Sequence, residues 1–167
     1  MKNLILSILT FSFVLFFTVD SQAQYLTVGG GVGYSTESEQ VNFTVNAAYK
    51  LPGLPMRLGG AVDYTIEDKT GNVRNSAIDG NINTYLMAVD TQLVSVYGLT
   101  GLNVYHQMVK IDSPSGSISE SDTSLGLNLG GGAEVQQGPT RFYAEMKYIF
   151  REDDARTVVS AGMRFRF

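Results

Sequence analysis

The stretch that runs from residue 141 to residue 150 reads RFYAEMKYIF, and its polar and apolar side chains alternate. Phe142 and Ala144 share one parity, whereas Arg141 and Glu145 share the other. Successive side chains of an extended strand point to opposite faces, so this stretch has one apolar and one charged face. A helix would distribute the same apolar residues around its axis. The stretch therefore predicts a β-strand.

The same period of two recurs along most of the chain. Five further segments alternate well, namely residues 26–34, 41–50, 56–67, 125–135 and 156–167. No stretch after residue 23 approaches the 18 consecutive apolar residues that indicate a membrane-spanning helix. We therefore expect an all-β chain.

Two segments, residues 83–90 and 93–109, alternate less cleanly. In the first, we expect Tyr85, Met87 and Val89 to face outward and Leu86 and Ala88 to face inward. In the second, Tyr97 and Leu99 differ in parity from Leu102 and Val104. A β-bulge near Gly101 would reconcile the two parities.

The connections between these eight segments alternate in length. Residues 51–55, 91–92 and 137–139 form short turns, and residues 35–40, 68–81, 110–121 and 151–155 form the other, mostly longer set. Eight strands joined in this way form a meander whose last strand can close on the first, which leaves no edge exposed. The expected architecture is an eight-stranded antiparallel up-and-down β-barrel.

The polar face of the strands is rich in glycine, and the aromatic residues gather near strand ends. Glycine weakens a strand that faces water, whereas inside a narrow barrel it makes room for long neighbours. Tyr34, Phe43 and Tyr148 lie toward the longer loops, and Phe142 and Phe165 toward the short turns. Two aromatic belts around an aliphatic band are typical of two lipid–water interfaces. We therefore expect the apolar face to point outward to lipid, in a transmembrane barrel.

The first 23 residues have the pattern of a secretory signal peptide. Lys2 precedes an apolar run from Leu4 to Val19, and Ser21 and Ala23 place small residues at positions −3 and −1 of a cleavage site. We expect residues 1–23 to be removed and residues 24–167 to form the barrel domain. The run is shorter than the roughly 20 residues of a transmembrane helix.

Composition excludes several classes of function. The chain has no Cys and a single His, which exclude disulfides, thiolate zinc sites and multi-histidine metal sites. Its net charge of −4 argues against nucleic acid as a partner. Gly29-Gly30-Gly31-Val32-Gly33 is followed by strand-like alternation and not by a helix, so it does not predict a phosphate-binding loop. We expect no cofactor and no metal.

The mature chain resembles the small eight-stranded outer-membrane barrels, the family of OmpX and of the OmpA membrane domain. The resemblance rests on the signal peptide, the meander, and the final strand with Met163, Phe165 and the terminal Phe167. It implies that these three residues are read by the machinery that inserts barrels into the outer membrane of a Gram-negative-type cell. It also implies contact with outer-membrane lipid and lipopolysaccharide.

Charged residues on the polar face are expected inside the barrel, where an unpaired charge would be costly. We expect Glu134 to lie near Arg141 across a tight turn, and Glu145 near Arg164, within a residue or two of the pairing register. The result would be a salt-bridged plug, either a structural polar core or a switchable gate for small ions. The expected network comprises Arg57, Asp63, Glu134, Arg141, Glu145, Lys147 and Arg164.

The longer loops carry an excess of acidic residues. Glu37, Glu39, Glu67, Asp68 and residues 152–154 predict an acidic outer rim. This rim is either a solvated surface or a contact for divalent cations or lipopolysaccharide, because carboxylates suit hard cations. We expect a monomer that contacts any extracellular partner through its loops.

Catalysis has one candidate base, His106, toward the loop end of its strand. An acyl-ester hydrolase would also need a serine nucleophile and an orienting acid. Ser117, Ser119 and Ser124 are available, but Gln107-Met108 follows His106 in place of the His-x-Ser arrangement of barrel lipid A deacylases. We expect a non-enzymatic surface barrel, with a lipid-modifying enzyme or a narrow gated channel as alternatives.

Overall fold

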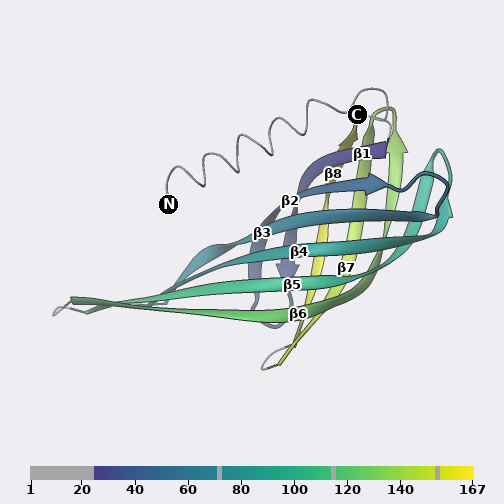
Figure 1. The fold of residues 1–167 in the computed structure, drawn as a ribbon. Coiled ribbons are helices and arrows are strands. Elements are labelled where there is room, and N and C mark those ends of the chain that lie inside the picture. The colour runs from purple at the N-terminus through teal and green to yellow at the C-terminus, as the bar shows by residue number, and fades with distance from the viewer. Residues whose placement is uncertain (1–24, 71–72, 114–115, 153–154) are drawn as a thin grey trace, which may run out of the picture.

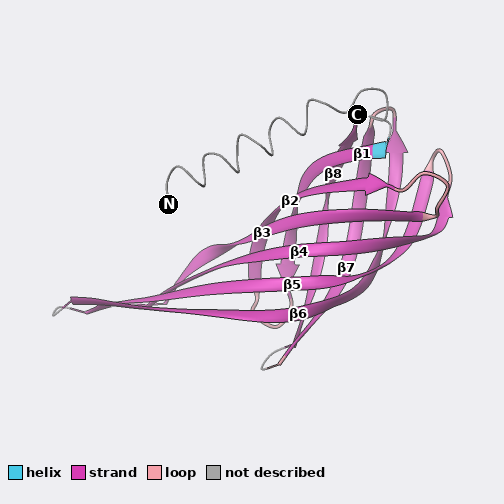
Figure 2. Cartoon of the chain, viewed as in Figure 1, coloured by secondary structure: helices cyan, strands magenta, loops and turns pink. Residues whose placement is uncertain are grey.

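The computed structural model describes residues 25–70, 73–113, 116–152 and 155–167. Nearly all of them belong to eight strands (Figure 2). Within these ranges no helix has the length and hydropathy needed to cross a membrane. The expected signal peptide, with Ser21 and Ala23, lies outside the described residues. The strands are β1 (Leu26–Ser35), β2 (Gln40–Lys50), β3 (Met56–Thr70), β4 (Val73–Asp90), β5 (Val94–Ser113), β6 (Gly116–Gln137), β7 (Thr140–Arg151) and β8 (Ala155–Arg166).

The strands form one closed antiparallel barrel in sequence order (Figure 1). Each strand pairs with the next along the chain, and β8 returns to pair with β1 from Thr27↔Arg166 to Ser35↔Val158. The predicted eight-stranded up-and-down barrel is therefore confirmed. Closure leaves no unpaired edge along this seam.

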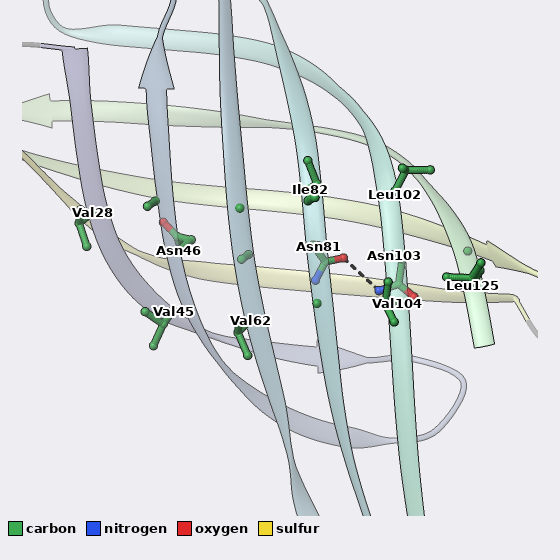
Figure 3. A pocket seen from close by; sticks show the side chains of 15 residues that line it. Val28, Val45, Asn46, Val62, Asn81, Ile82, Leu102, Asn103, Val104 and Leu125 are labelled. Atoms are coloured by element: carbon green, nitrogen blue, oxygen red, sulfur yellow. Dashed lines mark hydrogen bonds between the residues drawn. The ribbon is translucent and has the colours of Figure 1, made fainter. Parts of the chain in front are cut away.

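Apolar side chains cover the outside of the barrel and polar side chains fill the inside. Val45, Ile82 and Leu125 are 66%, 69% and 74% exposed, although all three are aliphatic. Their neighbours in sequence on the same strands include Asn46, Asn81 and Asn83, which are buried. Figure 3 shows the hydrogen bond that joins Asn81 of β4 to Asn103 of β5. The barrel therefore has the inverse polarity of a water-soluble domain.

Strands β3 to β6 are longer than the sequence predicts. Residues 73–81 belong to β4, and residues 110–113 and 116–121 extend β5 and β6, so the predicted loops 68–81 and 110–121 are wrong. The β5–β6 hairpin extends furthest from the barrel in Figure 1. These extensions are rich in Ser, Asp and Asn and lack a clear apolar parity. Cross-strand hydrogen bonds still hold them in register up to Ser113↔Gly116.

The predicted facing of β4 is also wrong. Tyr85 is buried and Leu86 is 50% exposed. Tyr85 lies inside because its ring packs edge-on against Tyr97, with the centroids 5.3 Å apart. The two rings join Ala48 and Leu99 in a small apolar layer inside the barrel.

No bulge forms at Gly101, which pairs regularly with Asn83. Tyr97 and Leu99 point inward, whereas Leu102 and Val104 point outward, so β5 keeps a single regular parity. The irregularity instead lies on β4 between Met87 and Val89. It leaves Ala88 exposed, contrary to the sequence prediction, and returns Val89 to the outer face.

Candidate functional site

The inside of the barrel holds a dense set of charged side chains. The structure buries all seven residues of the expected network, together with Asp79, which was expected in a loop, and Arg156, which was expected on the polar face of the last strand but outside the network. These nine residues come from β3, β4, β6, β7 and β8. Among them are five cations and four carboxylates, and each takes part in at least one ion pair.

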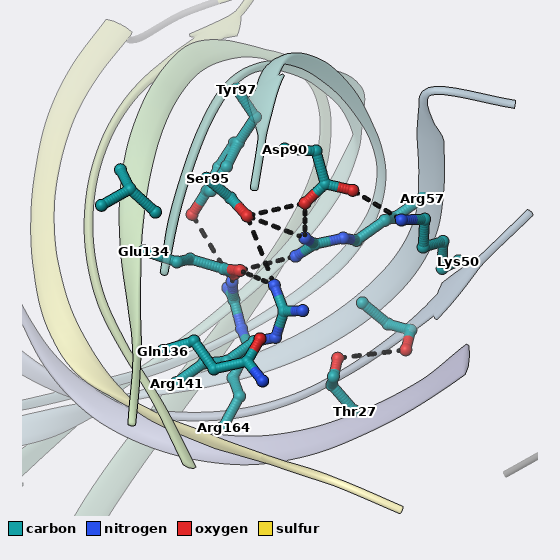
Figure 4. Close-up of polar contacts among 12 residues, drawn as sticks. Thr27, Lys50, Arg57, Asp90, Ser95, Tyr97, Glu134, Gln136, Arg141 and Arg164 are labelled. Carbon is teal, nitrogen blue, oxygen red and sulfur yellow. Dashed lines mark hydrogen bonds and ion pairs between the residues drawn. The ribbon is translucent and has the colours of Figure 1, made fainter. Parts of the chain in front are cut away.

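Glu134 of β6 is the centre of the largest cluster (Figure 4). Arg57 donates from Nη1 to its Oε2 at 2.6 Å, and Arg141 donates to the same oxygen at 3.1 Å. Arg164 donates from Nη1 to Oε1. Glu134 is 1% exposed, so a buried carboxylate is compensated by three guanidinium groups.

The cluster continues toward the short turns. Asp90, at the end of β4, accepts from Lys50 at 2.6 Å and from Arg57 at 3.3 Å. The Ser95 hydroxyl donates to Asp90 at 2.7 Å and accepts from Arg57 and Arg141, both at 3.4 Å. This end of the lumen is therefore a continuous network of hydrogen bonds across strands β2 to β7.

Glu145 and Arg164 contact each other, but by a different register from the expected one. Their side chains approach to 3.5 Å. The ladder pairs Glu145 with Ser160 and Arg164 with Arg141, so the contact runs diagonally across β7 and β8. The expected offset of one or two residues is wrong, because the length of the arginine side chain spans the larger shift. Tyr97 also donates to Glu145, at 3.0 Å.

Aromatic rings enclose the Arg164 guanidinium. Its central carbon lies 4.0 Å from the centroid of the Tyr143 ring and 5.6 Å from that of Tyr85. Arg164 Nε also donates to Asn46 at 2.8 Å. A Cβ atom at Gly31 would collide with the Tyr143 hydroxyl, so the glycine of β1 makes the room that this packing requires.

A second cluster lies around Asp63 of β3. Lys147 donates to Asp63 at 3.1 Å, Asn81 at 2.9 Å and Thr44 at 2.5 Å. Asn128 extends this cluster, because it donates to Asn81 at 2.9 Å. Amide side chains thus connect the ion pair to the opposite wall of the barrel.

Asp79 and Arg156 form an ion pair that sequence reasoning missed. Arg156 Nη2 lies 2.5 Å from Asp79 Oδ2, and Asp79 is fully buried. Asn103 also donates to Asp79, and the Arg156 guanidinium lies 5.0 Å from the Tyr105 ring centroid. The alternation of the last strand could have identified Arg156 as a lumen residue, because Arg156 and Arg164 lie on the same face of that strand.

These side chains leave almost no free space in the middle of the barrel. The cavity between Asp63, Tyr143, Glu145 and Arg164 has a volume of about 10 Å³. That is about the space of a single water molecule. The clusters therefore close the lumen in this conformation.

The proposed catalytic residues do not come together. His106 lies on the exposed face of β5, and its Nδ1 is 2.8 Å from the Thr123 hydroxyl. Ser124 follows Thr123 and therefore faces the other side of β6, whereas Ser119 is exposed. The side chain of Ser117 lies outside the described residues. Among the side chains that are described, no group of three His, Asp or Glu residues could hold a metal ion.

One acidic residue of the expected outer rim has a defined structural role. Glu37, in the β1–β2 turn, accepts from the Thr157 amide at 2.7 Å and from the Thr157 hydroxyl at 3.0 Å. These bonds, and above all one from the Thr36 hydroxyl, lower the pKa of Glu37 to about 2. Glu39 and Glu152 are exposed, whereas the side chains of Glu67, Asp68 and residues 153–154 lie outside the described residues.

The three residues of the expected insertion signal lie on the outer face at the end of the chain. Met163, Phe165 and Phe167 are exposed, and the Phe167 amide donates to the Leu26 carbonyl at 3.1 Å. The outer face also has an apolar groove of about 640 Å³ across β1 to β6, which includes Val28, Val45 and Leu102 (Figure 3). Both features lie on the surface that apolar side chains dominate.

Comparisons with solved structures show the fold. The attachment invasion locus protein Ail of Yersinia pestis is 17% identical and has a TM-score of 0.60, over 86% of this chain and 97% of that one. Neisserial surface protein A is 15% identical with a TM-score of 0.60, over 86% and 96%. A major outer membrane protein of Thermus thermophilus is 14% identical with a TM-score of 0.65, over 85% and 98%. No protein-family model and no curated protein matches this chain.

Proposed function

We propose that this chain is an integral outer-membrane barrel with a structural and surface-contact role. Residues 1–23 would direct export and be removed, and residues 24–167 would form the membrane domain. The polarity of the barrel carries this proposal. Aliphatic side chains such as Val45 and Leu125 cover its outside, where lipid would shield them and water would not.

The apolar outer surface also indicates which partners the protein contacts. The apolar belt contacts outer-membrane lipid and lipopolysaccharide, and Met163, Phe165 and Phe167 are offered to the barrel-insertion machinery during assembly. The protein acts as a monomer, and an extracellular partner meets the loop end with its long β5–β6 hairpin. Ail has been solved with the heparin analogue sucrose octasulfate. Such a polysulfated ligand does not suit the loop end of this barrel, because exposed Glu39 and Glu152 would repel it.

The closed lumen argues against a channel and in favour of a structural core. A cavity of about 10 Å³ does not admit a hydrated ion. The isolation of His106 from Ser119 and Ser124 argues against a lipid-modifying enzyme of the hydrolase type. Neither alternative has an observation in its favour.

The membrane proposal is tested by gel mobility of the protein extracted from outer membranes. We expect the unheated protein to migrate differently from the boiled protein, because the folded barrel resists detergent. A mature chain that stayed soluble and folded without detergent, and bound a hydrophobic dye in its centre, would overturn the proposal.

Two further measurements test the role assigned to the lumen. In planar bilayers we expect conductance at background, and a Glu145→Ala variant that also stays at background would count against a gate. Lipid A from cells with the His106→Ala variant is expected to keep the wild-type mass. A change in that mass would favour the enzyme.

A further inference from the structure

The barrel opens into a polar pocket at its short-turn end. This pocket, hereafter the mouth pocket, has a volume of about 590 Å³. Its floor and walls come from the ends of five strands and two of the turns between them. The polar side chains that line it include Lys50, Asp90, Gln92, Gln136, Arg141 and Arg166.

The charges around the mouth pocket do not balance. Its cations, together with those of the network just beneath it, are Lys50, Arg57, Arg141, Arg164 and Arg166. The carboxylates that face these five cations are Asp90, Glu134 and Glu145. Deeper in the barrel, Asp63 pairs with Lys147 and Asp79 with Arg156. Among these side chains the cations therefore outnumber the carboxylates by two.

Two arginines at this end have unused donors. Arg166 makes no ion pair or side-chain hydrogen bond within the part of the chain that the structure describes. Arg141 is 7% exposed and is fixed by Glu134 and Ser95, yet its buried Nε has no hydrogen-bond partner. The exposed guanidinium of Arg166 is therefore available to an anion from outside the chain, whereas the buried Nε of Arg141 is closed off from the pocket.

We propose that the mouth pocket binds the phosphate group of an anionic ligand. The guanidinium of Arg166 and the ammonium of Lys50 supply charge, the held side chain of Arg141 supplies a fixed wall, and the amides of Gln92 and Gln136 supply neutral donors. Because the barrel wall is a low-dielectric shell, it concentrates the field of these cations at the opening.

The position of the pocket leaves two sources for this phosphate. Phe142 and Phe165 on the outer face mark the lipid–water interface at the short-turn end, so headgroup phosphates lie at a similar depth. A soluble phosphate ester in the adjoining compartment would offer the same chemistry. Both ligands would make the same contacts with Lys50 and Arg166.

The experiment is calorimetric titration of the full-length mature barrel in a neutral detergent, with inorganic phosphate in one arm and a soluble short-chain phosphatidic acid in the other. The variant is Arg166→Gln, because Arg166 is exposed and its loss leaves the buried network intact. Arg166→Lys retains the charge. The matched control is Lys69→Gln, which removes one positive charge from β3 beyond the opposite end of the barrel. Gel mobility verifies that each variant is folded.

We expect saturable binding that Arg166→Gln weakens about tenfold, the effect of roughly one charge-assisted hydrogen bond. Arg166→Lys should retain most of the affinity, and Lys69→Gln should change it by less than about twofold at physiological ionic strength. Equal affinities in the two arms identify the free anion as sufficient, and tighter binding of the lipid identifies a headgroup site. The proposal is overturned if neither ligand binds the folded barrel, or if Lys69→Gln weakens binding as much as Arg166→Gln.

Discussion

Replacing Glu134 by Gln tests whether one carboxylate holds the cationic end of the lumen together. Three arginines donate to it, and they lose this partner to different extents. Arg57 keeps Asp90 at 3.3 Å, and Arg164 keeps Glu145 at 3.5 Å. Arg141 keeps only the Ser95 hydroxyl at 3.4 Å. The variant thus leaves about one full buried charge uncompensated, which should lower the free energy of unfolding by about 3–5 kcal/mol.

The assay is urea unfolding of the barrel in lipid vesicles, followed by the difference in gel mobility between folded and unfolded protein. The control is Glu120→Gln, because Glu120 is exposed on the extended part of β6 and its loss should change stability by less than about 0.5 kcal/mol. Adding Arg141→Gln to the Glu134→Gln variant should recover part of the loss, since it removes the stranded cation. The reasoning is refuted if Glu134→Gln destabilises the barrel no more than Glu120→Gln does.

Three further predictions concern the outer face, the seam and the loops. Ile82→Arg should lower the free energy of unfolding in vesicles by about 2–4 kcal/mol, the cost of a cation at the bilayer midplane. An unchanged free energy of unfolding would indicate that Ile82 faces water and not lipid. Gly162→Ala should lose about 1–3 kcal/mol in the same urea assay because its Cβ would overlap the β1 backbone, whereas Gly60→Ala should change little, with no atom closer than 3.6 Å. The folded pKa of Glu37 is depressed, so its contribution to stability is full above about 4.5 and is lost as the pH falls through about 2. The amide proton shift of Thr157 should therefore titrate near pH 2 in NMR spectra, and a midpoint near 4.5 would contradict the hydrogen bonds of Glu37.

The strands that lie wholly within the apolar belt were predictable from the sequence. In β7 every second residue faces outward in the apolar belt and the others face the lumen, so residues 141–150 alternate without a break. The extended parts of β4, β5 and β6 were not predictable in this way. The end of the β5–β6 hairpin has exposed polar side chains such as Ser119 and Glu120, and the extended part of β4 puts the polar Asp79, not an apolar residue, on its buried face. Their side chains therefore carry no periodic signal, and Ser, Asp and Asn look like a loop.

The residues of the charged clusters were predictable where they lie on clearly alternating strands. Residues such as Glu134 and Arg164 stand on the polar parity of clear strands, whereas Asp79 lay in a segment without visible alternation. The facing of Tyr85 failed for another reason. A tyrosine suits both an interfacial belt and a buried layer, and its parity on an irregular strand does not distinguish the two. The diagonal contact of Glu145 with Arg164 depends on the shear of the barrel, which no local pattern encodes.

The length of the β5–β6 hairpin determines how the protein presents itself to its surroundings. A strand needs only about 9–11 residues to cross a bilayer, whereas β5 has 20 and β6 has 22. At about 3.3 Å per residue, the remaining half of each strand amounts to some 30 Å measured along the strand. Because β5 and β6 stay paired up to Ser113↔Gly116, the extended hairpin is an ordered two-stranded ribbon, and the barrel wall sets its direction. A binding partner would therefore contact a hairpin that is already ordered. Substitutions near the tip of the hairpin would alter what the hairpin recognises and leave the barrel wall unchanged.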